Sequence, residues 1–273
     1  MNNSLKDSRI NKAVALFTSG KLKDCLTITL KLIKIYPTEP FLFNLSGVVN
    51  AAMHNYQKAI QNYKKALSLN SGYIEVYNNI GVAYKEWGKA EIALKYLNEA
   101  IRLNPSYSEA YNNLGNAQKD LSQLDEAIDN YSKAIDLNPS YVDAMCNKGI
   151  SLALQEKYEK SLKCFKSSLK NLKKLKMENS FLGISTQAAK LLALKNLNLD
   201  FDREYFFKLT KDIEELDYSL NLMSFDLTGN NLYIKNANGQ IQEIISKIDN
   251  ELGNKFMSYP IPKRILEEYK KLK

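Results

Sequence analysis

The sequence has few of the residues on which catalytic, metal and disulfide sites are usually built. Its 273 residues include only three Cys, one His and one Trp. Three Cys cannot form a disulfide framework, so we expect a reducing compartment and a cytoplasmic protein. No apolar run reaches about 18 residues, which excludes a membrane-spanning helix. The polar N-terminus lacks the apolar core of a secretory signal.

Because His and Cys are scarce, the sequence shows no recognisable catalytic site. His54 stands alone in a predicted turn, and no His lies near Cys146 in the sequence. No metal-ligand spacing, phosphate-binding loop or dinucleotide motif occurs, and the carboxylates form no recognisable acid–base pair. We therefore predict a protein that is not an enzyme and has no catalytic residue, metal or cofactor.

The positive charge is concentrated in one segment. The net charge is +8, from 38 basic and 30 acidic side chains. Residues 142–176 alone contain nine Lys and three acidic residues. A local cluster differs from the broad positive field that attracts nucleic acid, so we expect no specific nucleic-acid binding.

The sequence contains an internal repeat of 34 residues. Residues 77–81 read YNNIG and residues 111–115 read YNNLG, and the Asn-Pro pairs at 104–105 and 138–139 have the same offset. Extended in both directions, this register gives five units, which cover residues 6–39, 40–73, 74–107, 108–141 and 142–175.

Each unit alternates small and large residues at fixed positions, as two closely crossing helices require. Unit position 8 is occupied by Ala13, Gly47, Gly81, Gly115 and Gly149. Position 24 holds the large residues Tyr63, Leu97, Tyr131 and Phe165. Proline at position 32 predicts the end of the second helix, at Pro37, Pro105 and Pro139.

This pattern resembles the tetratricopeptide repeat over residues 6–175. The resemblance implies an all-α fold, a right-handed superhelical α-solenoid of antiparallel helix pairs whose first helices line a concave groove. The outer units depart from the family pattern, because Arg9 replaces an aromatic residue and Lys12 and Lys148 occupy position 7. Atypical outer units are expected where a stack of repeats ends.

Asparagine dominates the positions that face the groove in this family. An Asn side chain can pair with both the C=O and the N–H of a peptide unit, and the series is similar to the asparagine ladder of some protein glycosyltransferases. It therefore favours an extended peptide; alternatively, these Asn only support the helices. The candidate groove residues are Asn11, Asn44, Asn78, Asn79, Lys85, Asn112, Asn113, Asn116, Lys119 and Asn147.

Unit position 5 argues against one subtype of the family. Versions that bind chaperone C-termini carry Lys there, whereas this chain has none, so a chaperone adaptor is not expected. The occupants are Ile10, Asn44, Asn78, Asn112 and Cys146, and the register predicts that Cys146 points toward the groove.

A second candidate surface is basic. Five lysines fall within one arc of the predicted helix in the fifth unit: Lys163, Lys166, Lys170, Lys173 and Lys174. Such a face suits a phosphate, an acidic protein or an anionic membrane surface, or it is simply solvated.

Residues 176–273 lose the 34-residue register and match no family that we recognise. Helical patterns suggest a mostly helical cap, with a short hairpin or loop around residues 232–234. One predicted helix contains Phe181, Ile184, Ala188, Leu191, Leu192 and Lys195, and we expect it to pack on the fifth unit.

Together these patterns predict a non-catalytic adaptor or scaffold that binds a protein partner, as an extended peptide or a partner helix, in the concave groove. Two alternatives remain open. One is a substrate-recruiting subunit of a glycosyltransferase, sulfotransferase or oxygenase type of enzyme, and the other is a self-assembling scaffold or homo-oligomer.

Overall fold

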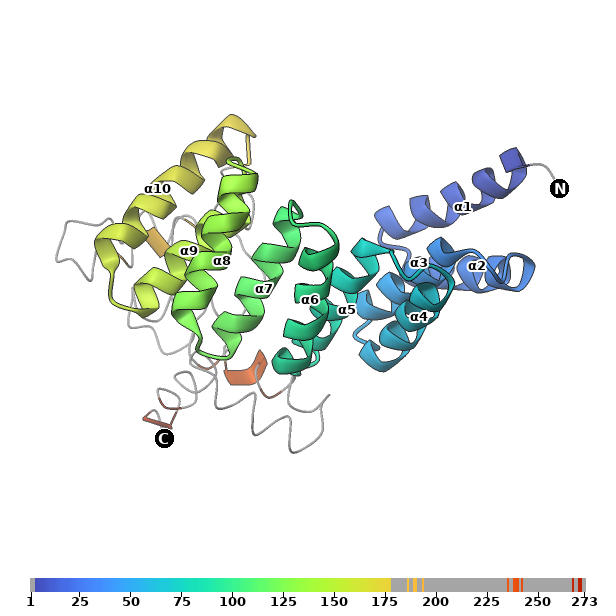
Figure 1. The fold of residues 1–273 in the computed structure, drawn as a ribbon, viewed down its shortest axis with the longest axis horizontal. Helices are drawn as coiled ribbons and strands as arrows, with labels where there is room; N and C mark the ends of the chain where they lie inside the picture. The colour runs from blue at the N-terminus through green and yellow to red at the C-terminus, as the bar shows by residue number, and fades with distance from the viewer. Residues whose placement is uncertain are drawn as a thin grey trace. The chain divides into compact units, whose positions relative to one another are not determined.

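The computed structural model describes residues 3–177 and the separate positions 186, 189, 190, 193, 235, 238–240, 242, 267, 270 and 271. Residues 3–177 form ten helices (Figure 1), and each of the five repeat units contains one pair. The pairs are α1 (Asn3–Thr18) and α2 (Leu22–Ile35), α3 (Pro40–Ala52) and α4 (Tyr56–Leu69), α5 (Ile74–Glu86) and α6 (Ala90–Leu103), α7 (Ser108–Asp120) and α8 (Leu124–Leu137), and α9 (Val142–Leu154) and α10 (Tyr158–Lys174).

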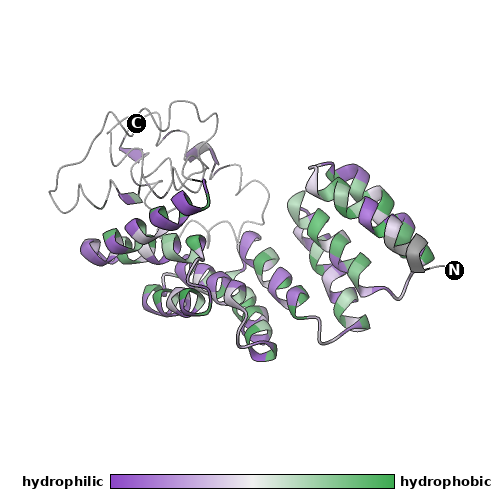
Figure 2. Ribbon diagram, turned by 90° about the horizontal axis from the view of Figure 1, so that it is seen from above, coloured by the Kyte–Doolittle hydropathy of each residue, from purple (hydrophilic) through white to green (hydrophobic). Residues whose placement is uncertain are grey.

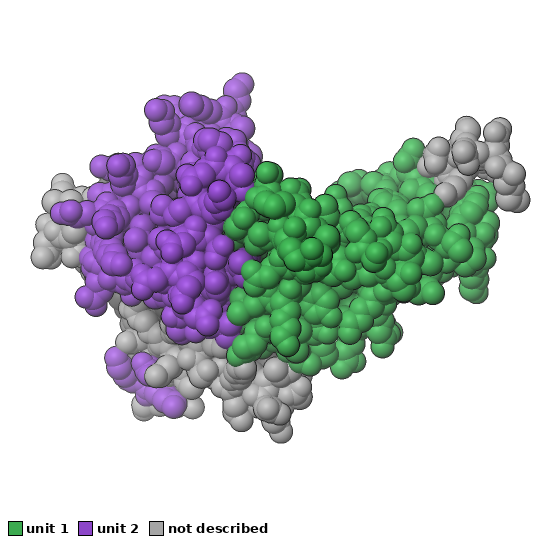
Figure 3. Space-filling model, viewed as in Figure 1, with its two compact units in different colours: residues 1–113 green, residues 114–273 purple. Residues whose placement is uncertain are grey.

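The chain divides into two compact units, residues 1–113 and 114–273, which Figure 3 colours separately. In unit 1, each helix from α1 to α5 packs against the next helix in the chain. In unit 2, α8 packs against α9 and α9 against α10. Within residues 3–177, the expected all-α solenoid of consecutive helix pairs is confirmed. Figure 2 shows hydrophobic and hydrophilic residues on the same helices, as one-sided burial requires.

Within the described residues, no helix combines the length and apolarity that a membrane crossing requires. The same residues contain no group of three or more His, Cys, Asp or Glu side chains with metal-ligand geometry. The sequence-based expectations for residues 232–234 and for most of 194–273 lie outside the part of the chain that the structure describes.

The repeated glycines lie where the two helices of a unit cross. A Cβ atom placed on Gly115 would lie 2.7 Å from Cε1 of Tyr131, and one on Gly149 would lie 2.6 Å from Cε1 of Phe165. Tyr131 and Phe165 are both fully buried. The pairing of unit positions 8 and 24 therefore sets how closely the helices approach.

The turn between the two helices has the same unusual backbone in every unit. Unit position 15 has a positive φ throughout, at Gly20 (73°), His54 (59°), Gly88 (73°), Ser122 (64°) and Glu156 (60°). This left-handed conformation ends a helix and is least strained for glycine. Three of the five units therefore place a less suitable residue at the same turn.

We expect the double substitution Ser122→Gly/Glu156→Gly to raise the free energy of unfolding by about 1–2 kcal/mol, because it removes left-handed strain at two exposed positions. Urea unfolding followed by circular dichroism measures the change. The control is Lys133→Gly, at an exposed position inside α8, where glycine should cost about 1 kcal/mol. A stability loss in the double variant would contradict the turn argument.

Residues after the fifth unit cover its end. Thr186, Ala189 and Ala193 are helical and buried, with the three-to-four-residue spacing of one helix face. Ala189 and Ala193 pack against Leu162 and Phe165 of α10. These contacts agree with the helix predicted near residues 181–195, although the residues named for it (Phe181, Ile184, Ala188, Leu191, Leu192 and Lys195) lie outside the described part.

Candidate functional site

Two hydrogen bonds connect asparagines on the first helices of consecutive repeats in unit 1. Nδ2 of Asn79 on α5 donates to Oδ1 of Asn44 on α3 over 3.1 Å. Nδ2 of Asn113 on α7 donates to Oδ1 of Asn78 on α5 over 2.9 Å. In each hydrogen bond the residue at position 6 of one repeat donates to the residue at position 5 of the preceding repeat. The bond repeats because the sequence places Asn at both positions.

Burial separates the asparagines into two roles. Asn78 and Asn112 at position 5 are only 6% and 5% exposed, so they offer a partner little surface. Asn78 therefore acts mainly as the hydrogen-bond acceptor that orients the side chain of Asn113. Asn79 and Asn113 are half-buried, and each keeps its Oδ1 and a second N–H without a hydrogen bond to any described residue.

Asn44 is itself held by a neighbour. It is half-buried and forms a side-chain hydrogen bond with Tyr73. Burial raises the pKa of Tyr73, and this hydrogen bond acts in the opposite direction. Tyr73, Asn44 and Asn79 thus form a chain of polar groups, in which the amide of Asn79 is oriented by a side chain that is already fixed.

Residues 74–107 and 108–141 match the profile of a family described as tetratricopeptide repeat, and residues 51–88 match a second profile described as TPR repeat. Residues 51–141 therefore contain tetratricopeptide repeats. A search of curated proteins finds no match.

Solved structures share the fold of these tetratricopeptide repeats. A tetratricopeptide repeat protein from Parabacteroides merdae is 18% identical, with a TM-score of 0.63 over 93% of this chain and 99% of its own. Pseudomonas aeruginosa pilF is 18% identical, with a TM-score of 0.63 over 85% of this chain and 95% of its own. MamA is 25% identical, with a TM-score of 0.53 over 59% of this chain and 95% of its own.

The other candidate residues of the repeats lie in different surroundings. Asn11 on α1 is exposed, and Asn147 and Lys119 are half-buried. In unit 2, Oδ1 of Asn116 accepts a hydrogen bond from the hydroxyl of the buried Tyr131 over 2.9 Å. Asn116 therefore already serves the packing of its own repeat.

Charge at the end of α5 is mixed in sign. Nζ of Lys85 lies 2.6 Å from Oε1 of Glu86.

An aromatic cluster that the repeat pattern did not predict lies next to this ion pair in the sequence. Tyr84 stacks on Trp87 and on Tyr96, with ring centroids 6.3 and 5.5 Å apart. The only Trp of the chain was the available signal, because Trp favours protein interfaces.

Cys146, which the register predicted to point toward the groove, is buried and is not available to a partner. The side chain is 4% exposed. Its Sγ lies 3.1 Å from Oγ of Ser168 and 2.6 Å from Oγ1 of Thr186. Burial raises the pKa of the thiol, so the reactive thiolate is disfavoured. The repeat register could not predict this burial, because Thr186 lies beyond the repeats.

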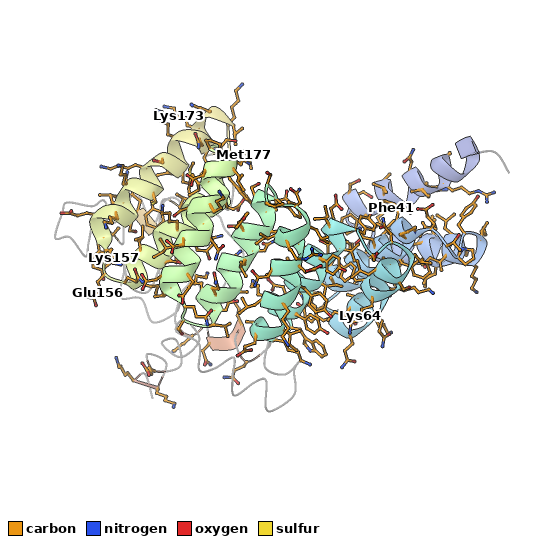
Figure 4. All side chains as sticks on the ribbon, in the orientation of Figure 1. Phe41, Lys64, Glu156, Lys157, Lys173 and Met177 are labelled. Carbon is orange, nitrogen blue, oxygen red and sulfur yellow. The ribbon has the colours of Figure 1, made fainter. Side chains whose placement is uncertain are left out.

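The five lysines of the basic face are all exposed on α10: Lys163, Lys166, Lys170, Lys173 and Lys174. Figure 4 marks Lys173 near the C-terminal end of this helix and Lys157 near its start. The five lysines place positive charge along one side of α10, while Phe165 and Leu172 of the same helix are fully buried.

Proposed function

We propose that this protein is a non-catalytic scaffold that binds an extended peptide along the first helices of its tetratricopeptide repeats. The observation that carries the proposal is the pair of bonds from Asn79 to Asn44 and from Asn113 to Asn78. Each bond consumes one N–H of the donor and leaves a carbonyl oxygen and a second N–H. A peptide unit presents the complementary N–H and C=O.

Pre-orientation supports this function over a purely structural one. A free amide would lose rotational freedom when it binds a peptide, and that loss weakens binding. The supporting asparagines restrict Asn79 and Asn113 before a partner arrives. Recognition through backbone groups depends little on partner side chains, which suits a scaffold with more than one partner. The three Cys are free thiols, consistent with the reducing, cytoplasmic setting that we propose.

The test is the double substitution Asn79→Ala/Asn113→Ala. Peptides are first selected on the intact chain from a phage-displayed library, and their affinities are then compared by fluorescence anisotropy. We expect at least about a tenfold loss, because two amide pairs with the peptide backbone are removed. The helix content measured by circular dichroism should not change.

The matched control is Asn98→Ala, at an exposed position on α6. It removes an equivalent side chain from a second helix and should leave affinity unchanged. If both variants bind the selected peptides as tightly as the intact chain, the asparagines only support the helices. Loss of affinity in the control as well would place the site elsewhere.

A further inference from the structure

Unit 2 has a pocket whose lining includes none of the asparagines of the candidate site. It has a volume of about 700 Å³ and opens between α8, α9 and α10. Its floor includes Ile128 and Ile135 from α8, and Met145 and Leu152 from α9. Each pair is separated by seven residues, so each helix contributes an apolar row of two turns, about 10 Å long.

The charged residues that line this pocket are four lysines and two aspartates, Asp125 and Asp129, so the lining is basic on balance. Lys148 of α9 lines it, as do Lys160 and Lys163 of α10 and Lys157 just before α10. Lys157 is partly neutralised, because its Nζ lies 3.8 Å from Oδ1 of Asp125. Among the residues that the structure describes, Lys148, Lys160 and Lys163 form no ion pair. Three lysines are thus available to an anionic ligand.

The α10 side of the pocket follows one face of that helix. Lining residues on α10 run from Lys160 through Lys163 and Cys164 to Ser167, a spacing of three or four residues that keeps them on one face. With Lys157 included, this wall covers about 15 Å of helix length. Parallel apolar rows beside a long charged wall match the shape of an amphipathic helix lying in a groove.

We propose that this pocket is a second binding site, which takes an acidic amphipathic helix of a partner protein. Apolar side chains of that helix contact the rows formed by Ile128, Ile135, Met145 and Leu152. Glu or Asp side chains on its flanks meet Lys148, Lys160 and Lys163. The local lysine excess of residues 142–176 then serves a defined pocket rather than a diffuse surface.

The probe is a labelled synthetic peptide of four helical turns, with Leu on one face and Glu at the other positions. Its control has the same composition in an order that scatters Leu around the helix. Binding to the full chain is followed by fluorescence anisotropy. We expect the ordered peptide to bind at least about tenfold more tightly than the scattered one, because only its Leu residues reach the floor together.

Charge reversal locates the site. Lys160→Glu/Lys163→Glu reverses two lysines that line the pocket, whereas Lys166→Glu/Lys170→Glu reverses two exposed lysines on α10 that do not. Both variants have the same net charge. The first is expected to weaken binding at least about tenfold and the second less than about twofold. Equal losses would mean attraction to the whole basic face and would overturn the proposal.

Isoleucine methyl spectra supply a readout that does not depend on charge. The signals of Ile128 and Ile135 should shift when the ordered peptide is added, and the signal of Ile74 on α5 in unit 1 should not. Unchanged Ile128 and Ile135 signals would overturn the proposal. So would binding to phosphatidylserine-containing vesicles combined with no binding to the peptide, since the basic residues would then serve a membrane.

Discussion

Replacing Phe165 by alanine is expected to lower the free energy of unfolding by about 3–5 kcal/mol. The ring is fully buried and packs against Leu162, Ala189 and Ala193. It also fills the space over Gly149. The substitution therefore opens a cavity at the contact between α9, α10 and the segment that follows them. Little of this contact can relax, because the surrounding side chains are small or already buried.

Urea unfolding gives the total loss, and hydrogen exchange shows where it occurs. Repeats contact mainly their neighbours, so exchange should accelerate in α9 and α10 and stay unchanged in α3 and α4. Leu175→Ala, at a position 55% exposed just after α10, is the control and should cost less than about 0.5 kcal/mol. Equal protection of α9 and α10 in the Phe165→Ala variant and the intact chain would refute this account.

Alkaline pH is expected to destabilise the protein steeply. Burial raises the pKa of Tyr63 and Tyr131 well above the usual value of 10.0. Above pH 10 the unfolded chain releases these protons and the folded chain keeps them, so the unfolded state binds fewer protons. The stability present below pH 10 is therefore lost as pH rises toward the folded pKa values. The slope is about 1.4 kcal/mol per pH unit for each tyrosine.

The double variant Tyr63→Phe/Tyr131→Phe should flatten this dependence. Tyr131 donates a hydrogen bond to Asn116, so the variant should lose about 1 kcal/mol at neutral pH and yet be less sensitive above pH 10. Urea unfolding between pH 8 and about pH 12 measures both effects. Tyr158→Phe, at a half-buried position that starts α10, serves as the control. An unchanged slope in the double variant would assign the alkaline loss to other groups.

The helices could be predicted from the sequence because each repeat contains residues that mark where its helices end. Pro105 and Pro139 follow α6 and α8, which end at Leu103 and Leu137. The glycines at position 8 and the large residues at position 24 meet within each repeat, so their contact could be predicted from the sequence of a single repeat. The left-handed turn at position 15 was not visible, because His54, Ser122 and Glu156 do not signal it.

Features that depend on contacts between helices were harder to predict. Predicting the hydrogen bond from Asn79 to Asn44 requires knowing how two consecutive repeats align in space. The presence of Asn at both positions 5 and 6 was the only indication of it in the sequence. The pocket combines Ile135, Lys148 and Lys163 from three helices, whereas a helical wheel describes only one. Burial of Cys146 depends on Thr186, which lies beyond the repeats and outside their period.

The hydrogen bonds between asparagines also have a mechanical consequence. Asn44 and Asn79 lie on consecutive repeats, so their 3.1 Å hydrogen bond restrains the movement of one repeat relative to the next. Bending between these two repeats would lengthen the hydrogen bond. If a peptide binds the Asn79 amide as proposed above, we expect it to resist this bending. We therefore expect unit 1 to extend less under a given pulling force when the peptide is bound.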